Sequence, residues 1–288
     1  MFSCLYICRV VFRKPDITRT TKNASKMNYY IITGASRGIG EALTRKLIEP
    51  GNTIFAASRT LNEDLVELAS SLNVPLFYHE VDLSSSKNAE LFINEVFSKI
   101  QLSQYDRIVL INNAGMLEPV APVKSIDFAL AENHLHLNLL TPMILSSVFL
   151  TKTEGIAENK VILNISSGAS FIAYSGWSVY CSSKAGLDML TQVAGLEQST
   201  ELHPVKIFAL TPGIIETGMQ ELIRTTDVNL FPERDKFIRL HEEGKLTNPD
   251  DIAQIILSTI FNDDIVSGSV VTIEQLKEII LPTSFRCA

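Results

Sequence analysis

A tyrosine and a lysine four residues apart are the pair in this chain best suited to proton transfer. Tyr180 and Lys184 stand in the run Gly176-Trp-Ser-Val-Tyr-Cys-Ser-Ser-Lys184, and on a helix this spacing places both side chains on one face. A lysine ammonium close to a phenol favours the phenolate, so we expect the pKa of Tyr180 to fall below about 10. A tyrosine with a lowered pKa can transfer a proton near neutral pH. The same spacing also fits a half-buried tyrosine beside a solvated lysine, so the rest of the chain must decide.

A serine precedes this pair by thirteen residues. Ser167 closes a run of apolar and β-branched residues that begins at Val161 and is typical of a buried strand with an exposed end. Its hydroxyl is therefore a candidate hydrogen-bond donor beside Tyr180, or a capping group. Cys181 follows the tyrosine, but one helix position away it faces elsewhere, and we interpret it as a packed thiol.

Composition indicates a single globular domain. The chain has 288 residues, 46% of them hydrophobic and 20% charged, which is enough to bury a large core. A net charge of −7 argues against general nucleic-acid binding. The four cysteines form no Cys-x-x-Cys pair, so neither a metal site nor a disulfide framework is expected. Apolar runs are shorter than a membrane span requires.

The first 26 residues differ from the rest of the chain. They are basic and poor in acids, and an apolar stretch interrupted by Arg9 resembles a mitochondrial presequence. They also fit a disordered or non-native extension, because Met27 lies just before the first predicted strand and could be the real start. We therefore expect an extension over 1–26, a catalytic domain over 27–276 and a tail over 277–288. The expected location is cytoplasmic, or mitochondrial if the presequence is genuine.

Buried strands alternate with helices from residue 28 onward. Helical patterns lie between them, and Pro249 starts a late helix well. Continuous apolar strands alternating with helices predict a doubly wound α/β domain, with a mostly parallel seven-stranded sheet covered on both faces. The expected strands are 29–33, 53–57, 75–80, 107–112, 161–165, 206–210 and 270–273.

Three glycines connect the first strand to the first helix. Gly34, Gly38 and Gly40 have the spacing Gly-x3-Gly-x-Gly, which allows a tight turn and lets backbone N–H groups approach a pyrophosphate at the helix N-terminus. A glycine triplet alone is a weak signal, but its place between a strand and a helix makes it a strong one. The sequence therefore predicts a dinucleotide site here.

The end of the second strand indicates which dinucleotide binds. A free ribose 2′-hydroxyl usually meets an acid at this corner, whereas a 2′-phosphate needs a cation. The chain has no acid there, but Arg59 and Arg37 can both reach the corner, so we predict NADP(H), with solvated surface cations as the alternative. Asp82, at the end of the third strand, could accept a hydrogen bond from adenine. The small residues of 112–115 would let the adenosine pass over the sheet edge.

Together these motifs resemble the short-chain dehydrogenase/reductase family, whose fold is Rossmann-type. Thr-Gly-Ala-Ser-Arg-Gly-Ile-Gly, Asn-Asn-Ala-Gly, the Ser–Tyr–Lys spacing and Pro212-Gly213 match the family pattern over about 28–275. The resemblance implies that Ser167, Tyr180 and Lys184 are catalytic, joined by Asn138, which could instead cap a helix. The cofactor-binding residues it implies are Gly34, Ser36, Arg37, Gly38, Ile39, Gly40, Arg59, Asp82, Leu83, Asn112, Asn113, Ala114, Gly115, Tyr180, Lys184, Pro212, Gly213, Ile215 and Thr217.

A narrower resemblance is to the branch of sepiapterin reductases and benzil reductases that form (S)-benzoin. Shared stretches include Gly176-Trp177, Asp188-Met-Leu190 and Pro212-Gly-Ile-Ile-Glu-Thr217. Both groups reduce a 1,2-dicarbonyl-type group on a flat aromatic or heteroaromatic molecule. Sepiapterin reductases place an aspartate on the last strand to hold the pterin, whereas this chain has Thr272 there, which cannot supply a charged acceptor.

Residues 214–246 interrupt the alternation with charged and aromatic residues, and we expect an irregular lid over the substrate. Ser167, Trp177, Tyr180 and Met219 are the predicted substrate contacts, and the pocket should be apolar and of aromatic size. Ordinary core packing is the alternative. Further lining candidates are Leu222, Phe231, Phe237, Phe171 and Tyr174. The helices at 138–150 and 178–199 are apolar on more than one face, and family members pair such helices in a homodimer.

The sequence thus predicts NADPH-dependent reduction of a ketone or 1,2-diketone on an aromatic small molecule. Ser167 and Tyr180 would stabilise the developing alkoxide, Tyr180 would donate its proton, and Lys184 would lower the pKa of Tyr180 and hold the ribose. Asn138 would position a water that resupplies the proton. The alternatives are a sepiapterin-type pterin reductase, a broad ketone or 3-oxoacyl reductase, and a non-catalytic NADP-binding regulator.

Overall fold

The structure is a computed structural model that describes residues 8–9, 27–157 and 159–280. The predictions for the rest of 1–26 and for the end of the tail lie outside these residues. Eight strands form one sheet in the order β1-β4-β3-β2-β5-β6-β7-β8. Their bounds are β1 Cys8–Arg9, β2 Met27–Thr33, β3 Asn52–Ser58, β4 Leu76–Glu80, β5 Tyr105–Asn112, β6 Lys160–Ile165, β7 Lys206–Thr211 and β8 Val270–Thr272.

Seven of these strands, β2 to β8, are parallel, as the sequence predicts. The two-residue strand β1 adds an antiparallel pair at the edge, where Cys8 lies opposite His79. The central strands are buried along their whole length, as in β3 and β6, because helices cover both faces of the sheet.

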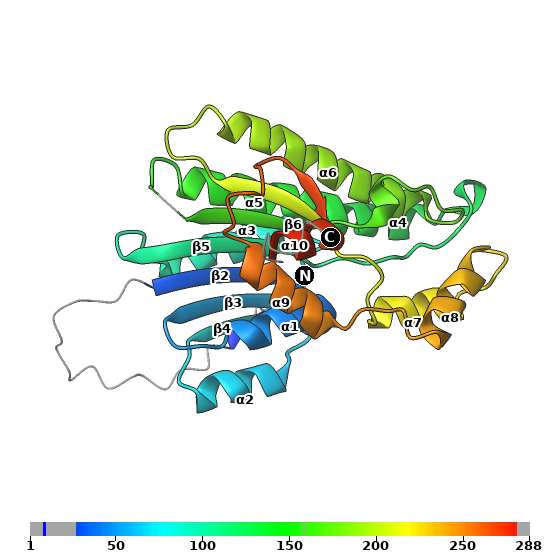
Figure 1. Cartoon of the computed structure of the whole chain (residues 1–288), viewed down its shortest axis with the longest axis horizontal. Helices are drawn as coiled ribbons and strands as arrows, with labels where there is room; N and C mark the ends of the chain where they lie inside the picture. The colour runs from blue at the N-terminus through cyan, green and yellow to red at the C-terminus, as the bar shows by residue number, and fades with distance from the viewer. Residues whose placement is uncertain (1–7, 10–26, 158, 281–288) are drawn as a thin grey trace, which may run out of the picture.

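Helices pack on the sheet in two layers (Figure 1). One apolar core lies between the sheet and α1, α2, α9 and α10, and a second lies between the sheet and α3, α5 and α6. This is the predicted doubly wound arrangement. The helix bounds are α1 Gly38–Leu47, α2 Glu63–Ser71, α3 Ser86–Lys99, α4 Phe128–Leu135, α5 Thr141–Lys152, α6 Ser178–Gln198, α7 Gly218–Thr225, α8 Arg234–Glu242, α9 Pro249–Thr259 and α10 Ile273–Ile280, with short turns η1 Val123–Ser125, η2 His136–Leu140 and η3 Gly168–Ser170.

The strand order reverses between β2 and β5. From β2 the chain runs outward through β3 and β4, then returns to β5 and continues on the other side. Ligands of such sheets bind at the carboxyl ends of the strands on either side of this switch point. Thr33, the last residue of β2, links the carboxyl ends of β2 and β5. Its hydroxyl accepts hydrogen bonds from the backbone N–H groups of Asn113 and Ala114, both at 3.0 Å.

A π-helical turn, η2, joins α4 and α5 into one long helix. The sequence predicts a mostly helical section there but gives no sign of this irregularity, and such turns are frequent at functional sites. By length and composition alone the helix Phe128–Lys152 could cross a membrane. Its buried face packs against the sheet through Leu145 and Phe149.

Two segments are more ordered than the sequence indicates. The predicted irregular lid contains the helices α7 and α8, which project beyond the carboxyl ends of the strands (Figure 1). Strand β8 ends at Thr272, and α10 begins with the next residue and continues to Ile280. The amphipathic helix α10 packs on the first core through Ile273 and Leu276.

Candidate active site

Strand β6 and helix α6 bring Ser167 and Tyr180 together. Ser167 follows the last residue of β6, and its hydroxyl accepts a hydrogen bond of 3.2 Å from the backbone N–H of Ala169. The same hydroxyl lies close enough to the Tyr180 phenol to lower the pKa of that phenol. Helix α6 begins at Ser178, so Tyr180 lies in its first turn, beside the end of the strand. The pairing predicted from the sequence spacing is therefore present.

Lys184 lies one turn further along α6 and is buried. Its Nζ donates a 2.7 Å hydrogen bond to the carbonyl oxygen of Ile165, the last residue of β6. Lys184 Nζ is 5.9 Å from the centroid of the Tyr180 ring. A Cβ atom built on Gly115 would lie 3.9 Å from Lys184 Nζ and 3.5 Å from Asn138 Oδ1. The ammonium and the amide therefore converge at the end of β5.

The predicted fall in the pKa of Tyr180 is wrong for the chain by itself. Burial raises the pKa of the phenol, and the nearby Ser167 hydroxyl opposes this only in part. The ammonium group of Lys184 is directed to Ile165 instead of the phenol oxygen. Burial also lowers the pKa of Lys184 to about 8, against the partial compensation of Asp188. Sequence spacing fixes a shared helix face, but it carries no information about desolvation.

Asn138 lies in the π-helical turn and is buried. Its Oδ1 accepts a 2.9 Å hydrogen bond from the backbone N–H of Met116, and its Nδ2 donates a 2.8 Å bond to the carbonyl of the same residue. The side chain therefore ties the turn to the loop after β5 and does not cap a helix. Its Nδ2 also lies 2.9 Å from Nε2 of His134.

His134 is a neighbour of the site that sequence reasoning missed. It is fully buried, its Nδ1 is 2.7 Å from the carbonyl oxygen of Glu118, and its ring meets the Tyr180 ring edge to face at 5.9 Å. Burial lowers its pKa to about 4. The one sequence signal was its position four residues before Asn138, which places both on one helical face.

The glycine turn has the shape of a phosphate cradle. Gly34 and Gly38 have φ angles of 70° and 60°, a region that side chains disfavour. A Cβ on Gly40 would overlap the carbonyl oxygen of Gly34. Asn113 holds this turn, because its Nδ2 donates to the carbonyls of Thr33 and Gly34 at 2.9 and 3.2 Å. The turn, which opens at the N-terminus of α1, fits the pyrophosphate of a dinucleotide.

The two predicted cations lie near this turn with exposed side chains. Arg37 precedes α1 and Arg59 follows β3. Within the described part of the chain neither arginine forms an ion pair, so both remain able to bind a phosphate. Arg37 Nη1 reaches toward α7, within 3.5 Å of a Cβ built on Gly218. Asp82 uses Oδ1 to accept hydrogen bonds from the backbone and hydroxyl of Ser84.

Some predicted cofactor residues direct their side chains away from the turn. Asn112 is buried and donates a 2.8 Å hydrogen bond to Asn164 Oδ1 inside the core. Leu83 and Ile215 pack into the two apolar cores. Their backbone positions at strand and loop ends remain beside the site. Ser36 and Ile39 belong to the turn and the start of α1, Ala114 lies against Gly34, Gly115 lies near Asn138, and Pro212 and Gly213 follow β7.

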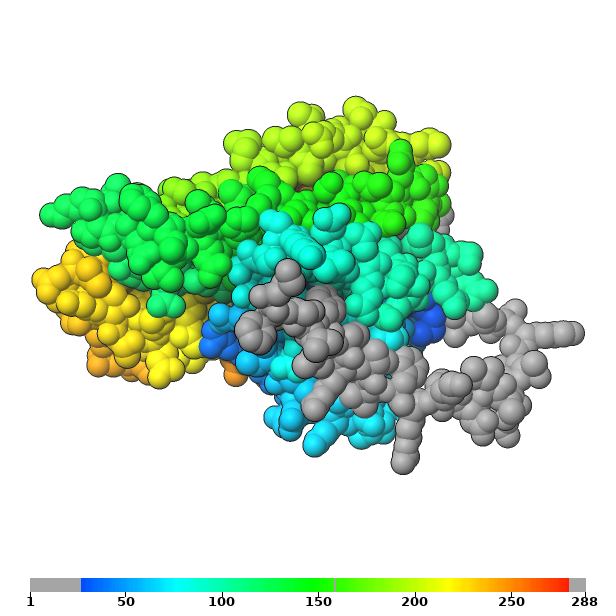
Figure 2. Space-filling model, turned by 180° about the vertical axis from the view of Figure 1, so that it is seen from behind, coloured from blue at the N-terminus to red at the C-terminus, as the bar shows by residue number. Residues whose placement is uncertain are grey.

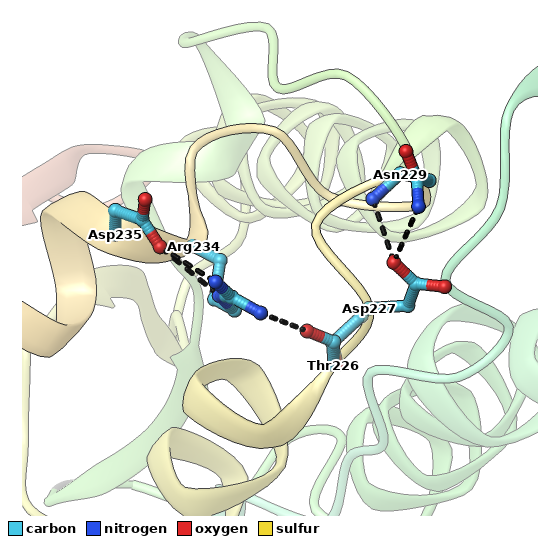
Figure 3. A network of polar contacts seen from close by, with 5 residues as sticks. All are labelled: Thr226, Asp227, Asn229, Arg234 and Asp235. Atoms are coloured by element: carbon cyan, nitrogen blue, oxygen red, sulfur yellow. Dashed lines mark hydrogen bonds and ion pairs between the residues drawn. The ribbon is translucent and has the colours of Figure 1, made fainter.

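The segment after β7 closes over the glycine turn. Thr217 lies with its methyl group 3.2 Å from a Cβ built on Gly38. At the start of α8, Arg234 donates hydrogen bonds to the Asp235 carboxylate and to the carbonyl of Thr226 (Figure 3). In the segment between α7 and α8, the Asp227 carboxylate accepts hydrogen bonds from the backbone and side chain of Asn229. These polar contacts give the segment between the two lid helices a defined conformation.

An aromatic cluster lies under the lid and against Tyr180. Trp177 and Phe231 stack at 4.5 Å with an angle of 3° between their planes, and Trp177 meets Tyr180 edge to face at 5.7 Å. Phe237 belongs to the same buried cluster, and Met219, Leu222 and Tyr174 pack against it half-buried. Phe171 is 66% exposed and lies outside the cluster. The predicted lining residues are therefore largely core residues of the lid.

Thr272 has a partner that the sequence analysis did not consider. Its backbone N–H donates a 2.8 Å hydrogen bond to Gln275 Oε1, and its hydroxyl accepts a 3.3 Å bond from the Gln275 backbone. This reciprocal pair is a capping box at the start of α10. The pattern Thr-x-x-Gln was visible in the sequence and could have predicted the helix.

Comparison with known proteins assigns the family. The model for short chain dehydrogenases matches residues 28–228. The chain belongs to the short-chain dehydrogenase family. It is therefore an oxidoreductase of a family that binds a nicotinamide dinucleotide, in agreement with the cradle at the glycine turn.

Its relatives include both groups of the narrower resemblance. The chain is 39% identical over 249 residues to a benzil reductase ((S)-benzoin forming) of Bacillus cereus, covering 86% of this chain and all of the relative. It is 32% identical to a sepiapterin reductase of Rattus norvegicus, covering 83% and 93%. The crystal structure of the KRED1-Pglu enzyme superposes with a TM-score of 0.73 at 27% identity, covering 85% of this chain and all of that one.

Proposed function

We propose that this protein is an NADPH-dependent carbonyl reductase that acts on a ketone or 1,2-diketone of an aromatic small molecule. The observation that carries the proposal is the position of the Tyr180 phenol. It lies beside the Ser167 hydroxyl, which lowers its pKa, and against Trp177, in the aromatic cluster under the lid. A proton donor with an apolar, aromatic neighbour suits a flat carbonyl substrate.

The catalytic roles follow from the contacts of three residues. A bound NADPH supplies the hydride. The Ser167 and Tyr180 hydroxyls donate hydrogen bonds to the carbonyl oxygen as it gains negative charge, and Tyr180 gives up its proton. The raised pKa of Tyr180 keeps the phenol protonated at neutral pH, which is the form that reduction requires. The nearby Lys184 ammonium stabilises the phenolate that remains.

Proton resupply is the proposed role of Asn138. Both hydrogens of its Nδ2 and one lone pair of Oδ1 are used in bonds to Met116 and His134. A water that relays a proton to Lys184 would therefore bond to the remaining lone pair or to the backbone carbonyl. The π-helical turn changes the hydrogen-bond ladder of the helix at this point.

The cofactor is proposed to be NADP(H) on the strength of Arg37 and Arg59. Both side chains are exposed beside the glycine turn, and arginine binds a phosphate dianion well. Replacing both arginines by alanine should raise KM for NADPH strongly and KM for NADH little. Equal effects on the two cofactors would contradict the assignment of the 2′-phosphate to these arginines.

The substrate assignment rests on the relatives and on Thr272. The benzil reductase of Bacillus cereus is more similar to this chain than the rat sepiapterin reductase is. Thr272 caps α10 and offers no carboxylate for a pterin amino group. A sepiapterin-type activity is the alternative, favoured by the 32% identity. A non-catalytic regulator is disfavoured because Ser167, Tyr180 and Lys184 are all present.

We further propose a homodimer through α5 and α6. These helices carry apolar side chains that are exposed in the single chain, and their surfaces adjoin one another on the face seen in Figure 2. The proposed location is the cytoplasm, or the mitochondrion if residues 1–26 are a presequence. Exposed apolar residues on α5 and α6 include Met143, Met189, Val193 and Leu196.

The deciding experiment measures NADPH oxidation by the full-length chain with benzil and sepiapterin side by side, with NADH as control. Turnover of benzil without sepiapterin supports the diketone assignment. The reverse would make the pterin the substrate. The Tyr180→Phe variant should bind NADPH but turn over neither compound, and normal turnover by this variant would remove Tyr180 from the mechanism.

A further inference from the structure

His134 is a buried titratable side chain that the proposed reaction leaves without a role. It is 0% exposed and lies on α4, one turn before Asn138. Its ring packs perpendicular to the Tyr180 ring, with an angle of 89° between the planes. It therefore contacts two of the four proposed catalytic residues at once.

The bonds around the imidazole fix where its proton lies. Nδ1 is 2.7 Å from the carbonyl oxygen of Glu118, which can only accept, so Nδ1 carries the hydrogen. Nε2 is then the acceptor, and it lies 2.9 Å from both Ser183 Oγ and Asn138 Nδ2. The Ser183 hydroxyl donates to the carbonyl of Tyr180 at 2.8 Å. The Asn138 Nδ2 hydrogen, which cannot rotate out of the amide plane, therefore donates to Nε2, and the rotatable Ser183 hydroxyl is a second donor within reach of the same atom.

This bond completes the fixation of the Asn138 amide. The backbone N–H of Met116 can only donate, so the atom facing it must be Oδ1. The two Nδ2 hydrogens then point to the Met116 carbonyl and to His134. With both ends determined, the amide has one orientation, and its Oδ1 lies toward Gly115 and the Lys184 ammonium.

We propose that His134, as the neutral tautomer protonated on Nδ1, is a positioning residue that holds the Asn138 amide in its working orientation beside Lys184. The inference rests on the proposed role of Asn138 in proton resupply. It assigns to His134 Nε2 the function of accepting a hydrogen bond from the Asn138 amide. An apolar ring at this position would fill the same space but leave a buried amide hydrogen without an acceptor.

The surroundings keep Nε2 free of a proton. From α6 it faces the neutral Tyr180 phenol ring and the Lys184 ammonium, which with burial lowers the pKa of His134 to about 4. From the loop after β5, the imidazole contacts the backbone carbonyl of Glu118. The side chains of Glu118 and of Glu132 on α4 are exposed and do not pair with the imidazole. Protonation would place two donors, Nε2–H and Nδ2–H, against each other.

Three variants separate this role from simple packing. His134→Phe keeps the ring but removes the acceptor, and kcat should fall about 10- to 100-fold with little change in KM for NADPH. His134→Gln offers a side-chain oxygen near the Nε2 position and should recover most of the loss. His136→Phe is the matched control, because that histidine lies on the same helical segment and contacts Ser86 instead of the site.

A double variant and a direct observation extend the test. If His134 acts through Asn138, adding His134→Phe to Asn138→Ala should lower kcat no further than Asn138→Ala alone. Nitrogen-15 NMR of the imidazole in the full wild-type chain should show the tautomer protonated on Nδ1 at neutral pH. This measurement needs no catalysis and no substitution, so it stands even where His134→Phe does not fold.

The outcomes distinguish the inference from the proposed function. Turnover of benzil by Tyr180→Phe would overturn the proposed function while leaving the tautomer of His134 measurable. An inactive Tyr180→Phe together with a folded His134→Phe that matches the wild-type kcat would overturn the positioning role alone. A tautomer protonated on Nε2, or equal losses in His134→Phe and His134→Gln, would do the same.

Discussion

A buried lysine lies at each end of strand β6, and the two differ in how their donors are used. At the amino end, Lys160 is 3% exposed and donates to the carbonyls of Thr153 and His203 at 3.0 and 2.8 Å. At the carboxyl end, Lys184 is 6% exposed and donates to one carbonyl, that of Ile165, at 2.7 Å. Burial lowers the pKa of both ammonium groups.

The difference lies in what the remaining hydrogens face. The Lys160 ammonium links the segment before β6 to the segment before β7, because it donates hydrogen bonds to a carbonyl in each. Lys184 has donor capacity left on the side of Gly115 and Asn138. A buried ammonium whose hydrogens bind loop carbonyls stabilises the fold, whereas one with a free hydrogen beside a proton donor can serve a reaction.

The largest expected effect is that of Lys184→Met on activity. Removing the ammonium should lower kcat about 10²- to 10⁴-fold, because the phenolate left by Tyr180 loses its nearest cation. Stability should rise, since the folded pKa of about 8 lies below the usual 10.5, so that below pH 8 keeping Lys184 charged in the fold costs free energy relative to the unfolded chain. The gain is about 1–3 kcal/mol, reduced by the unpaired Ile165 carbonyl.

These two quantities are measured by NADPH oxidation and by urea unfolding at pH 7. A variant that loses activity and stability together would show that Lys184 supports the fold as Lys160 does, and the contrast between the two ends of β6 would fail.

Lys160→Met should show the opposite pattern. Two buried carbonyls lose their donor, so the free energy of unfolding should fall by about 1–2 kcal/mol, while kcat with benzil stays at the wild-type value. Urea unfolding and steady-state kinetics on the same preparation check both parts. A fall in kcat without a fall in stability would contradict the structural role.

The smallest effect is a pH dependence of the wild-type rate. The reduction needs a protonated Tyr180 and a charged Lys184. Burial raises the pKa of Tyr180 and so keeps it protonated, whereas Lys184 loses its proton as pH rises through about 8. We therefore expect kcat to be steady below about pH 8 and to decline above it. Lys160→Met should retain this decline, and a profile that is flat up to about pH 10 would place the pKa of Lys184 elsewhere.

Local patterns in the sequence predicted most of the fold. The strands, the glycine turn and the positions of Ser167, Tyr180 and Lys184 follow from apolar runs and short spacings, which are local properties. The capping box at Thr272 was equally readable but was weighed only as a substrate contact. The helices α7 and α8 were not predicted, because their buried residues contact an aromatic cluster assembled from distant parts of the chain.

What the sequence could not supply depends on burial and on distant partners. The predicted direction of the pKa shift of Tyr180 was wrong. Burial raises the pKa of the phenol, and the Nζ of Lys184 is bound to the Ile165 carbonyl and does not offset this increase. The tie between Asn113 and the glycine turn joins residues about 80 positions apart. Asn138 was predicted as a member of the site and lies beside Gly115 in the structure, but its link to His134 requires knowing which helical face is buried.

The stack between Trp177 and Phe231 has a practical consequence. Trp177 is the single tryptophan of the chain, and it lies where the lid segment meets α6, 4.5 Å from Phe231 and next to Tyr180. Its emission therefore reports one location without any label. Separation of the lid would expose the indole to water and shift the emission to longer wavelength, so lid movement can be followed in stopped-flow experiments on the unmodified enzyme.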